Sequence, residues 1–294
     1  MTNICQKIRC QRHVVIIVFT TLNLEIDNRD IKFLMKLFPK GVIFFDLETT
    51  GLSPAHSEIL EFGAVKVKDN KASFFDELVK PSFPISAFIT ELTGITDEMV
   101  KNARRPKQVL SEFIPFLEDC TLIAHNAPFD VGHLMASCSN LDIKILDREV
   151  YCSCKLSRKC LDSPNHKLST IIDFLKLGQP RNLHRALGDA YLVYKVIIAI
   201  LKNEENIKKL PLSMIGSHFT SKKKIPQLLS AQIINDQKQI EILYRGGSHQ
   251  NIFRPIKPIS ILPLMNGKMV LYALCLLSNL YKNFDIEKIV EVKT

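Results

Sequence analysis

The most constraining feature of the sequence is a continuous apolar run over residues 41–48, Gly-Val-Ile-Phe-Phe-Asp-Leu-Glu. A short run of this kind predicts a central strand that is buried on both faces of a sheet. The run ends in Asp46 and Glu48, which are two positions apart and therefore point to the same face. Partly buried carboxylates repel each other unless a cation neutralises them, and oxygen ligands favour magnesium or manganese over zinc. A simple polar strand end remains the alternative for this pair alone.

Two further segments place an aspartate at the start of a predicted helix. Residues 125–130, His-Asn-Ala-Pro-Phe-Asp, follow a short predicted strand, so Asp130 falls in the first helical turn, where the helix dipole tolerates an anion. Residues 184–189, His-Arg-Ala-Leu-Gly-Asp, open a helix that is apolar almost all round and is therefore expected to be buried. Metal ligation is the better explanation for a buried Asp189, whereas an ordinary helix-start aspartate explains Asp130 when it is taken alone.

Taken together, the three segments resemble the DnaQ-like DEDDh exonuclease superfamily, as in the proofreading exonuclease of bacterial DNA polymerase III. The matching segments are DLETTGL at 46–52, HNAPFD at 125–130 and HRALGD at 184–189, with further likeness in FGAVKV at 62–67, LVKP at 78–81 and ITELTGITDEMV at 89–100. The resemblance covers about residues 41–202. It implies an α/β, ribonuclease H-like fold, with a five-stranded mixed sheet and helices on both faces.

The resemblance also implies a 3′→5′ exonuclease that hydrolyses phosphodiester bonds with two magnesium ions, for which manganese substitutes. The expected metal ligands are Asp46, Glu48, Asp130 and Asp189. His184 is expected to take the proton of the attacking water, since a histidine pKa near neutrality suits that task; a core or capping histidine is the alternative. Expected substrate contacts come from Thr49, Gly51, Leu52, His125, Asn126 and Phe129, although for Phe129 a core position is slightly favoured over stacking on the substrate. Glu61 is expected to be buried near the site but stands outside this set.

The expected substrate is DNA with single-stranded 3′ ends, from which the enzyme releases nucleoside 5′-monophosphates in repair or proofreading. An RNA-trimming exoribonuclease is the alternative enzyme, because nothing in the motifs excludes ribose. A nucleic-acid-binding regulatory module is the alternative from another class. The formal net charge of +9 suits a polyanionic partner, and a DNA polymerase is a candidate protein partner.

The texture of the chain divides it into four parts: an N-terminal extension at 1–40, the exonuclease domain at 41–202, a linker at 203–225 and a small β-rich domain at 226–294. Within the exonuclease domain we expect strands at 59–68 and 73–80 joined by a turn at 69–71, and helices near Thr96 and at 106–118, 167–177 and 186–202. Residues 1–30 are expected to form an extra strand or a poorly ordered extension. The linker is expected to be loose, because it is polar and lysine-rich.

The last domain resembles the WYL domain, a small β-rich module linked to nucleic-acid enzymes. The likeness rests on the opening strand IEILYR, on RPIKP at 254–258 and on the segments 272–275 and 282–289, whereas Met269-Val270-Leu271 stand where Trp-Tyr-Leu is expected. Lys282 and Lys288 replace the arginines of that family, and lysine lacks the fork that binds phosphate bidentately. A structural appendage is the alternative to a binding role.

The cysteines and the N-terminus bear on the compartment. Eight cysteines are scattered along the chain without a convincing export signal, which favours free thiols and a cytoplasmic protein. Cys152, Cys154, Cys160 and His166 form a cluster without the CxxC-like spacing of structural zinc sites, so zinc is a minor hypothesis. The apolar run at 14–19 follows basic residues but lacks a small-residue cleavage site, and we do not expect export.

Overall fold

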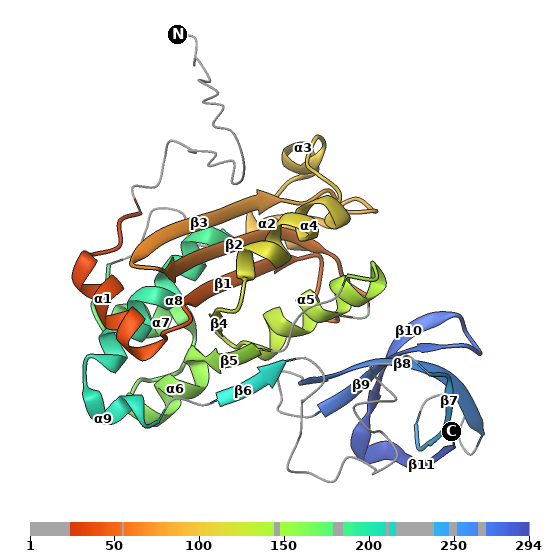
Figure 1. The fold of residues 1–294 in the computed structure, drawn as a ribbon. Helices are drawn as coiled ribbons and strands as arrows, with labels where there is room; N and C mark the ends of the chain where they lie inside the picture. The colour runs from red at the N-terminus through yellow and green to blue at the C-terminus, as the bar shows by residue number, and fades with distance from the viewer. Residues whose placement is uncertain are drawn as a thin grey trace.

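The computed structural model describes residues 24–54, 56–143, 148–178, 185–209, 212–215, 238–246, 252–263 and 269–293. These residues form two sheets, a mixed one covered by helices on both faces and an antiparallel one that follows it in the chain (Figure 1). The predictions for residues 1–23 and 216–237 concern a part of the chain outside the described residues.

The first sheet has β1 near its centre. Its strands are, in spatial order, β3 (Lys71–Leu78), β2 (Ile59–Lys68), β1 (Val42–Thr49), β4 (Thr121–Ala124), β5 (Arg148–Cys152) and β6 (Leu212–Ile215). The strand β1 is antiparallel to β2 and parallel to β4, so the mixed five-stranded sheet that we expected is confirmed, with β6 as a sixth, antiparallel edge strand. The predicted hairpin turn is confirmed at Asp69 and Asn70, whose φ angles of 51° and 57° match a type I′ turn.

Helices cover both faces of this sheet. The helices are α1 (Asn28–Leu37), α2 (Ala87–Thr93), α3 (Asp97–Val100), α4 (Pro106–Leu117), α5 (Pro128–Asn140), α6 (Ser153–Cys160), α7 (Leu168–Phe174), α8 (Ala186–Leu201) and α9 (Glu204–Ile207). On one face α4 and α5 pack on the sheet, where the ring of Phe113 lies 4.7 Å from that of Phe62. On the other face α1, α7 and α8 share a second core with Phe44 and Val65. The helices predicted at 106–118, 167–177 and 186–202 are confirmed.

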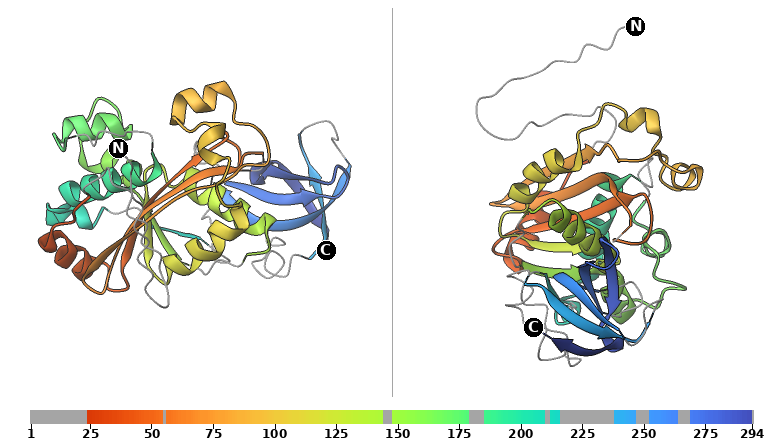
Figure 2. Two further views of the ribbon diagram at one scale, coloured as in Figure 1. Left: turned by 90° about the horizontal axis from the view of Figure 1, so that it is seen from above. Right: turned by 90° about the vertical axis from the view of Figure 1, so that its right-hand side faces the viewer.

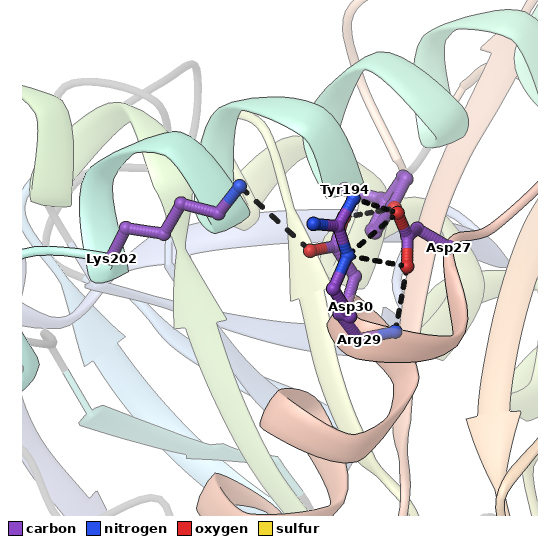
Figure 3. A network of polar contacts seen from close by, with 5 residues as sticks. All are labelled: Asp27, Arg29, Asp30, Tyr194 and Lys202. Atoms are coloured by element: carbon purple, nitrogen blue, oxygen red, sulfur yellow. Dashed lines mark hydrogen bonds and ion pairs between the residues drawn. The ribbon is translucent and has the colours of Figure 1, made fainter.

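The helix α1 belongs to the exonuclease unit, although we assigned residues 1–40 to an extension. Ile31, Leu34 and Phe38 are buried in the core beneath α8. The Tyr194 hydroxyl of α8 donates to Asp30 at 2.7 Å, and Lys202 lies 3.9 Å from the same carboxylate (Figure 3). Helix α1 therefore packs against the core of the mixed sheet, and the predicted domain boundary at residue 41 stays a prediction.

The helix α8 crosses the sheet at Gly63 of β2 in very close contact. A Cβ atom at Gly63 would lie 2.0 Å from the backbone of Ala186 and of Leu187, so any side chain there would force the helix away from the sheet. Glycine is therefore required by close backbone approach rather than by an unusual φ angle. This contact fixes the height of the first turn of α8 above β1 and β2.

The second sheet is antiparallel and has its own small core. Its strands are, in spatial order, β10 (Leu280–Asp285), β9 (Met269–Cys275), β8 (Phe253–Pro263), β7 (Ile240–Tyr244) and β11 (Ile289–Lys293), with a 3₁₀ turn at Ile286–Lys288. Ile242, Ile256, Leu271 and Phe284 form the centre of this core. The predicted β-rich character is confirmed, and β10 is a strand that the pattern did not reveal. The resemblance to the WYL domain stays a prediction.

The second sheet packs on helix α5, and both views in Figure 2 place the two side by side. Ala136 of α5 is buried together with Val270 and Tyr272 of β9, and the Tyr272 hydroxyl donates to Asn140 Oδ1 at 2.8 Å.

The stretch that we predicted as a loose linker at 203–225 contains α9 and β6, which pairs with β5. That prediction is wrong for residues 204–207, which are helical, and for residues 212–215, which backbone pairing to β5 holds in a strand. No helix among the described residues is long and apolar enough to cross a membrane.

Candidate active site

Three of the predicted metal ligands come together where β1 ends and α8 begins. Asp46, Glu48 and Asp189 each offer a carboxylate oxygen, and these atoms lie within 4.8 Å of one another. Within the part of the chain that the structure describes, no other three histidine, cysteine, aspartate or glutamate side chains gather so closely. The cysteines of the minor zinc hypothesis are therefore not gathered into such a group.

The fourth predicted ligand, Asp130, is held beside this group by α5. Its side chain is 2% exposed, and its Oδ1 accepts a hydrogen bond of 3.1 Å from the backbone N–H of Leu47, the residue between Asp46 and Glu48. The turn before α5 passes through Asn126, whose φ of 59° lies in the left-handed region, and Pro128 then opens the helix. This turn directs Asp130 back toward the end of β1.

The electrostatics of the cluster fit a site that binds a cation. Burial, followed by the charges of Asp130, Asp189 and Glu48, raises the pKa of Asp46 well above its usual range. Burial and then Asp189 raise the pKa of Glu48 to about 8, and burial also raises the pKa of Asp130. Repelling, buried, oxygen-only donors fit a hard divalent cation, which would displace these protons.

Sequence reasoning left Glu61 outside the site, and the structure places it directly behind the cluster. Glu61 of β2 is the cross-strand partner of Glu48 and is fully buried. Arg185 forms an ion pair with it, with Nε donating at 2.8 Å to Oε1. A glutamate inside the otherwise apolar segment ILEFGAV was the available signal, because a buried charge requires a partner. The identity of that partner could not be deduced, since the two residues are 124 positions apart.

Three predicted substrate contacts lie at the end of β1 and in the loop that follows it: Thr49, Gly51 and Leu52. Thr49 is buried, and its hydroxyl donates to the Gly51 carbonyl at 2.8 Å. The loop closes through Thr50, whose N–H donates to the Glu58 carbonyl at 2.9 Å. Leu52 is 76% exposed, so its side chain is free to contact a base. The substrate roles of Thr49, Gly51 and Leu52 stay predictions.

The remaining predicted contacts, His125, Asn126 and Phe129, have different surroundings. Both ring nitrogens of His125 are engaged, Nδ1 with the Ser153 hydroxyl at 2.9 Å and Nε2 with the His166 carbonyl at 3.0 Å. Burial lowers the pKa of His125 to about 4, so the ring is neutral and ties the end of β4 to α6. A phosphate contact would have to replace one of these bonds, which favours a structural role for His125.

Phe129 is half-buried on the first turn of α5. Its ring lies 4.4 Å from the ring of His133, and its carbonyl accepts a hydrogen bond of 3.0 Å from His133 Nδ1. The packing is consistent with the core role that we slightly favoured, while the exposed part of the ring leaves room for the predicted substrate contact. The predicted general base, His184, lies outside the described residues, immediately before Arg185.

Comparison with known proteins identifies the family of the mixed sheet and its carboxylates. The family model RNase_T, described as an exonuclease family, matches residues 43–197. The PolC-type DNA polymerase III of Caldanaerobacter subterraneus is 35% identical over 243 residues, which cover 79% of this chain and 17% of the polymerase. The corresponding polymerase of Latilactobacillus sakei is 41% identical over 160 residues, 52% of this chain and 11% of the polymerase. The chain thus spans less than a fifth of these relatives.

Solved structures agree on the fold. The nuclease domain of 3'hExo, a DEDDh family member bound to rAMP, matches 59% of this chain and 96% of its own with a TM-score of 0.50 at 20% identity. Exonuclease I of E. coli in complex with a dA16 oligonucleotide matches 80% of this chain and 55% of its own with a TM-score of 0.51 at 14% identity. The chain therefore belongs to the RNase_T exonuclease family.

Proposed function

We propose that this protein is a magnesium-dependent 3′→5′ exonuclease that trims DNA with single-stranded 3′ ends and releases nucleoside 5′-monophosphates in proofreading or repair. The observation that carries this proposal is the convergence of Asp46, Glu48 and Asp189 within 4.8 Å, with Asp130 bonded to the strand between the first two. No other arrangement of buried acids in the described residues offers a comparable site for hydrolysis.

The chain's own side chains would hold two magnesium ions. Asp46, Glu48 and Asp189 would bind the first, and Asp46 with Asp130 would bind the second. When bound, such a pair supplies an activated water and stabilisation of the leaving 3′ oxygen. His184 would take the proton of that water, because it follows the family motif five residues before Asp189. Manganese would replace magnesium, since both ions prefer carboxylate and water ligands.

The remaining motif residues would orient the terminal nucleotide. The backbone groups of Thr49 and Gly51 would contact its sugar, and the exposed Leu52 would pack against its base. Asn126 and Phe129 would contact the strand at the start of α5. For His125 the two existing hydrogen bonds support a role in holding that turn in place.

DNA is favoured over RNA because the relatives that match the chain are DNA polymerases, and because exonuclease I was solved with a DNA oligonucleotide. The alternative is an exoribonuclease, which is supported by the likeness to 3'hExo bound to rAMP. A polymerase partner is proposed from the same relatives. We place the protein in the cytoplasm, where such a partner would act.

The C-terminal sheet would add electrostatic grip on the nucleic-acid strand. Residues 203–294 carry 13 lysine and arginine residues against 7 acidic ones, most of the net charge of +9. The fold match to exonuclease I covers 80% of this chain, a larger share than the exonuclease unit alone. A regulatory module without catalysis is disfavoured, because it would not require four buried or half-buried carboxylates at one end of a sheet.

The deciding experiment compares matched oligonucleotides of DNA and RNA, single- and double-stranded, with either end labelled. We expect a metal-dependent ladder from 5′-labelled single-stranded DNA and release of labelled mononucleotide from the 3′-labelled strand. The Asp46→Asn variant is the control for a contaminating nuclease. Faster cleavage of RNA would assign the enzyme to RNA trimming, and absence of metal-dependent cleavage of every substrate would contradict the proposal.

A further inference from the structure

Two glutamates face each other on neighbouring strands at the active site. Glu48 of β1 and Glu61 of β2 are direct cross-strand partners, an arrangement in which like charges destabilise a sheet. Glu61 is fully buried, so its charge has no access to water. Burying a charge is costly unless the charge is paired and hydrogen-bonded. None of the proposed catalytic steps involves Glu61, so its burial calls for another explanation.

The compensation comes from Arg185, the residue before α8. Its Nε donates to both oxygens of Glu61, at 2.8 and 3.1 Å, and its Nη2 donates to Oε1. This forked contact holds the guanidinium in one orientation, which an ammonium group could not do. The pKa of Glu48 is raised mainly by burial. The negative charge of Glu61 raises this pKa further, whereas the positive charge of Arg185 lowers it.

Glu61 also caps the helix that carries a metal ligand. The first turn of α8 has no side-chain cap from its own chain segment. The backbone N–H of Ala186 instead donates to Glu61 Oε2 at 2.9 Å. A carboxylate at this place satisfies one of the free N–H groups and interacts favourably with the helix dipole. The strand β2 therefore holds the start of α8 through one side chain.

A short series of contacts connects Glu61 to Asp189. Arg185 is gripped through its side chain by Glu61, and its carbonyl accepts the N–H of Asp189 at 3.0 Å. The close contact at Gly63 blocks movement of this turn toward the sheet. The position of the Asp189 carboxylate relative to Asp46 thus depends on the ion pair and the cap together.

We propose that Glu61 and Arg185 are a positioning pair that sets the first turn of α8, so that Asp189 meets Asp46 and Glu48 at the separation that a shared metal ion requires. The proposal rests on the proposed function for the identity of the ion as a catalytic metal. It gives a purpose to a buried charge that repels the metal ligands. A pair that only stabilised the fold would contribute to unfolding free energy without affecting metal affinity.

The test measures Mn²⁺ binding to the full chain by calorimetry, together with hydrogen exchange of the Ala186 amide. Loss of an outer group that orients a metal ligand typically weakens metal binding by about 10- to 100-fold. We expect that loss in Glu61→Ala, a smaller one in Glu61→Gln, which keeps one acceptor, and faster exchange at Ala186 in both. Arg185→Lys keeps the charge but not the fork, so it should bind Mn²⁺ with intermediate affinity and serves if the Glu61 variants fail to fold.

Glu77→Gln is the matched control. Glu77 lies on β3 of the same sheet and pairs with Arg104 at 2.9 Å, away from the carboxylate cluster. This variant should retain the Mn²⁺ affinity of the wild type. If the Glu61 and Arg185 variants lose thermal stability but bind Mn²⁺ as the wild type does, the pair is structural only and the proposal is overturned. If Mn²⁺ affinity depends on Glu61 but the wild type cleaves no nucleic acid, the positioning pair stands and the proposed function fails.

Discussion

The two sheets of this protein treat buried charge in opposite ways. The mixed sheet gathers Asp46, Glu48, Glu61 and Asp130 at one end, where burial and mutual repulsion raise the pKa of both Asp46 and Glu48. Among the described residues of the C-terminal sheet, the only buried charged side chain is Arg254. Its guanidinium donates to the Gly246 carbonyl at 2.7 Å and lies over the ring of Tyr244.

This difference suggests different roles: the mixed sheet carries the candidate active site, and the C-terminal sheet carries none of its carboxylates. In the mixed sheet, removing the charge of Asp46 or Asp189 should abolish function and leave the fold more stable, which is the reverse of an ordinary core substitution. In the C-terminal sheet, removing an exposed lysine should alter nucleic-acid affinity at most, because the core of this sheet is apolar. The following tests challenge this contrast, beginning with the largest expected effect.

The largest effect is expected for Asp46→Asn and Asp189→Asn. Losing a metal ligand removes several kcal/mol of transition-state stabilisation, so the rate should fall by at least about 10³-fold. In chelator the same variants should melt higher than the wild type, by roughly 2–4 °C for each kcal/mol of relieved repulsion. Single-turnover cleavage and thermal melts check both signs. Activity within tenfold of the wild type would remove these residues from the metal site.

His184→Ala should reduce the rate by about 10²- to 10⁴-fold, the usual loss for a general base, with little change in substrate affinity. Part of the lost rate should return at alkaline pH, where hydroxide from the solvent is more available and no general base is needed to deprotonate the attacking water. The comparison is sharpened because this variant, unlike Asp46→Asn, should keep the Mn²⁺ affinity and the melting temperature of the wild type. Weakened substrate binding at an unchanged rate would instead make His184 a positioning residue.

Metal and pH should act together on the stability of the mixed sheet. The folded-state pKa of Glu48 is raised to about 8, so its favourable contribution is complete below about pH 4.5 and is lost as pH rises through 8. The metal-free protein should therefore become less stable between pH 5 and 8, while Mn²⁺ should stabilise it increasingly over the same range. Melts in chelator and in Mn²⁺ at several pH values measure this, and Asp46→Asn should flatten both trends. A metal effect independent of pH would contradict it.

Parts of the mixed sheet and of the candidate active site could be predicted from the sequence, and other parts could not. The central strand, the hairpin over β2 and β3, and α8 could be predicted because apolar periodicity marks any element that faces the core. Four carboxylates could be chosen because each lies within a local motif. The ion pair of Glu61 and Arg185 could not, since it joins residues 124 positions apart and depends on how α8 crosses Gly63.

Two elements near the predicted domain boundaries, β6 and α1, were not predicted for related reasons. The edge strand β6 is held by backbone hydrogen bonds to β5, and these leave little trace in the pattern of side chains. The apolar face of α1 is buried in the core, and its further hydrogen bond between Asp30 and Tyr194 joins two polar residues whose contact no periodicity predicts. For His125 the motif predicted a substrate contact, but its two hydrogen bonds to Ser153 and His166 appear only in the folded chain.

A moderate loss of stability is expected when the contact between the C-terminal sheet and helix α5 is weakened. Tyr272→Phe removes the hydrogen bond to Asn140 from a buried interface and should cost about 1 kcal/mol of unfolding free energy, with turnover unchanged within about twofold. Tyr191→Phe is the control, because it removes a similar bond, to the Glu25 carbonyl at 2.8 Å, from the other side of the protein. A tenfold loss of turnover in Tyr272→Phe alone would show that the second sheet acts on the active site through α5.

Packing on α5 also changes how the role of the C-terminal sheet is best tested. A chain that ends at residue 225 should keep metal-dependent cleavage of short oligonucleotides if it folds, since the active site supplies most contacts to them. It would, however, expose Ala136 and the surrounding apolar surface of α5. A loss of stability would then be confused with a loss of binding, so surface substitutions are the sharper experiment.

The smallest expected effect concerns Lys282 of β10 and Lys288 of the 3₁₀ turn, the lysine positions singled out by the WYL resemblance. If they contact phosphates, Lys282→Gln with Lys288→Gln should weaken binding to long single-stranded DNA. The slope of log affinity against log salt should then become shallower by about 0.7 for each lost contact, because fewer counterions are released. Turnover on short oligonucleotides should not change. Lys32→Gln with Lys36→Gln on α1 is the matched control, since it removes the same charge from two exposed lysines on the other side of the mixed sheet. Equal slopes in both pairs would leave the C-terminal sheet as a structural support, and the charge contrast between the two sheets would then have no bearing on nucleic-acid binding.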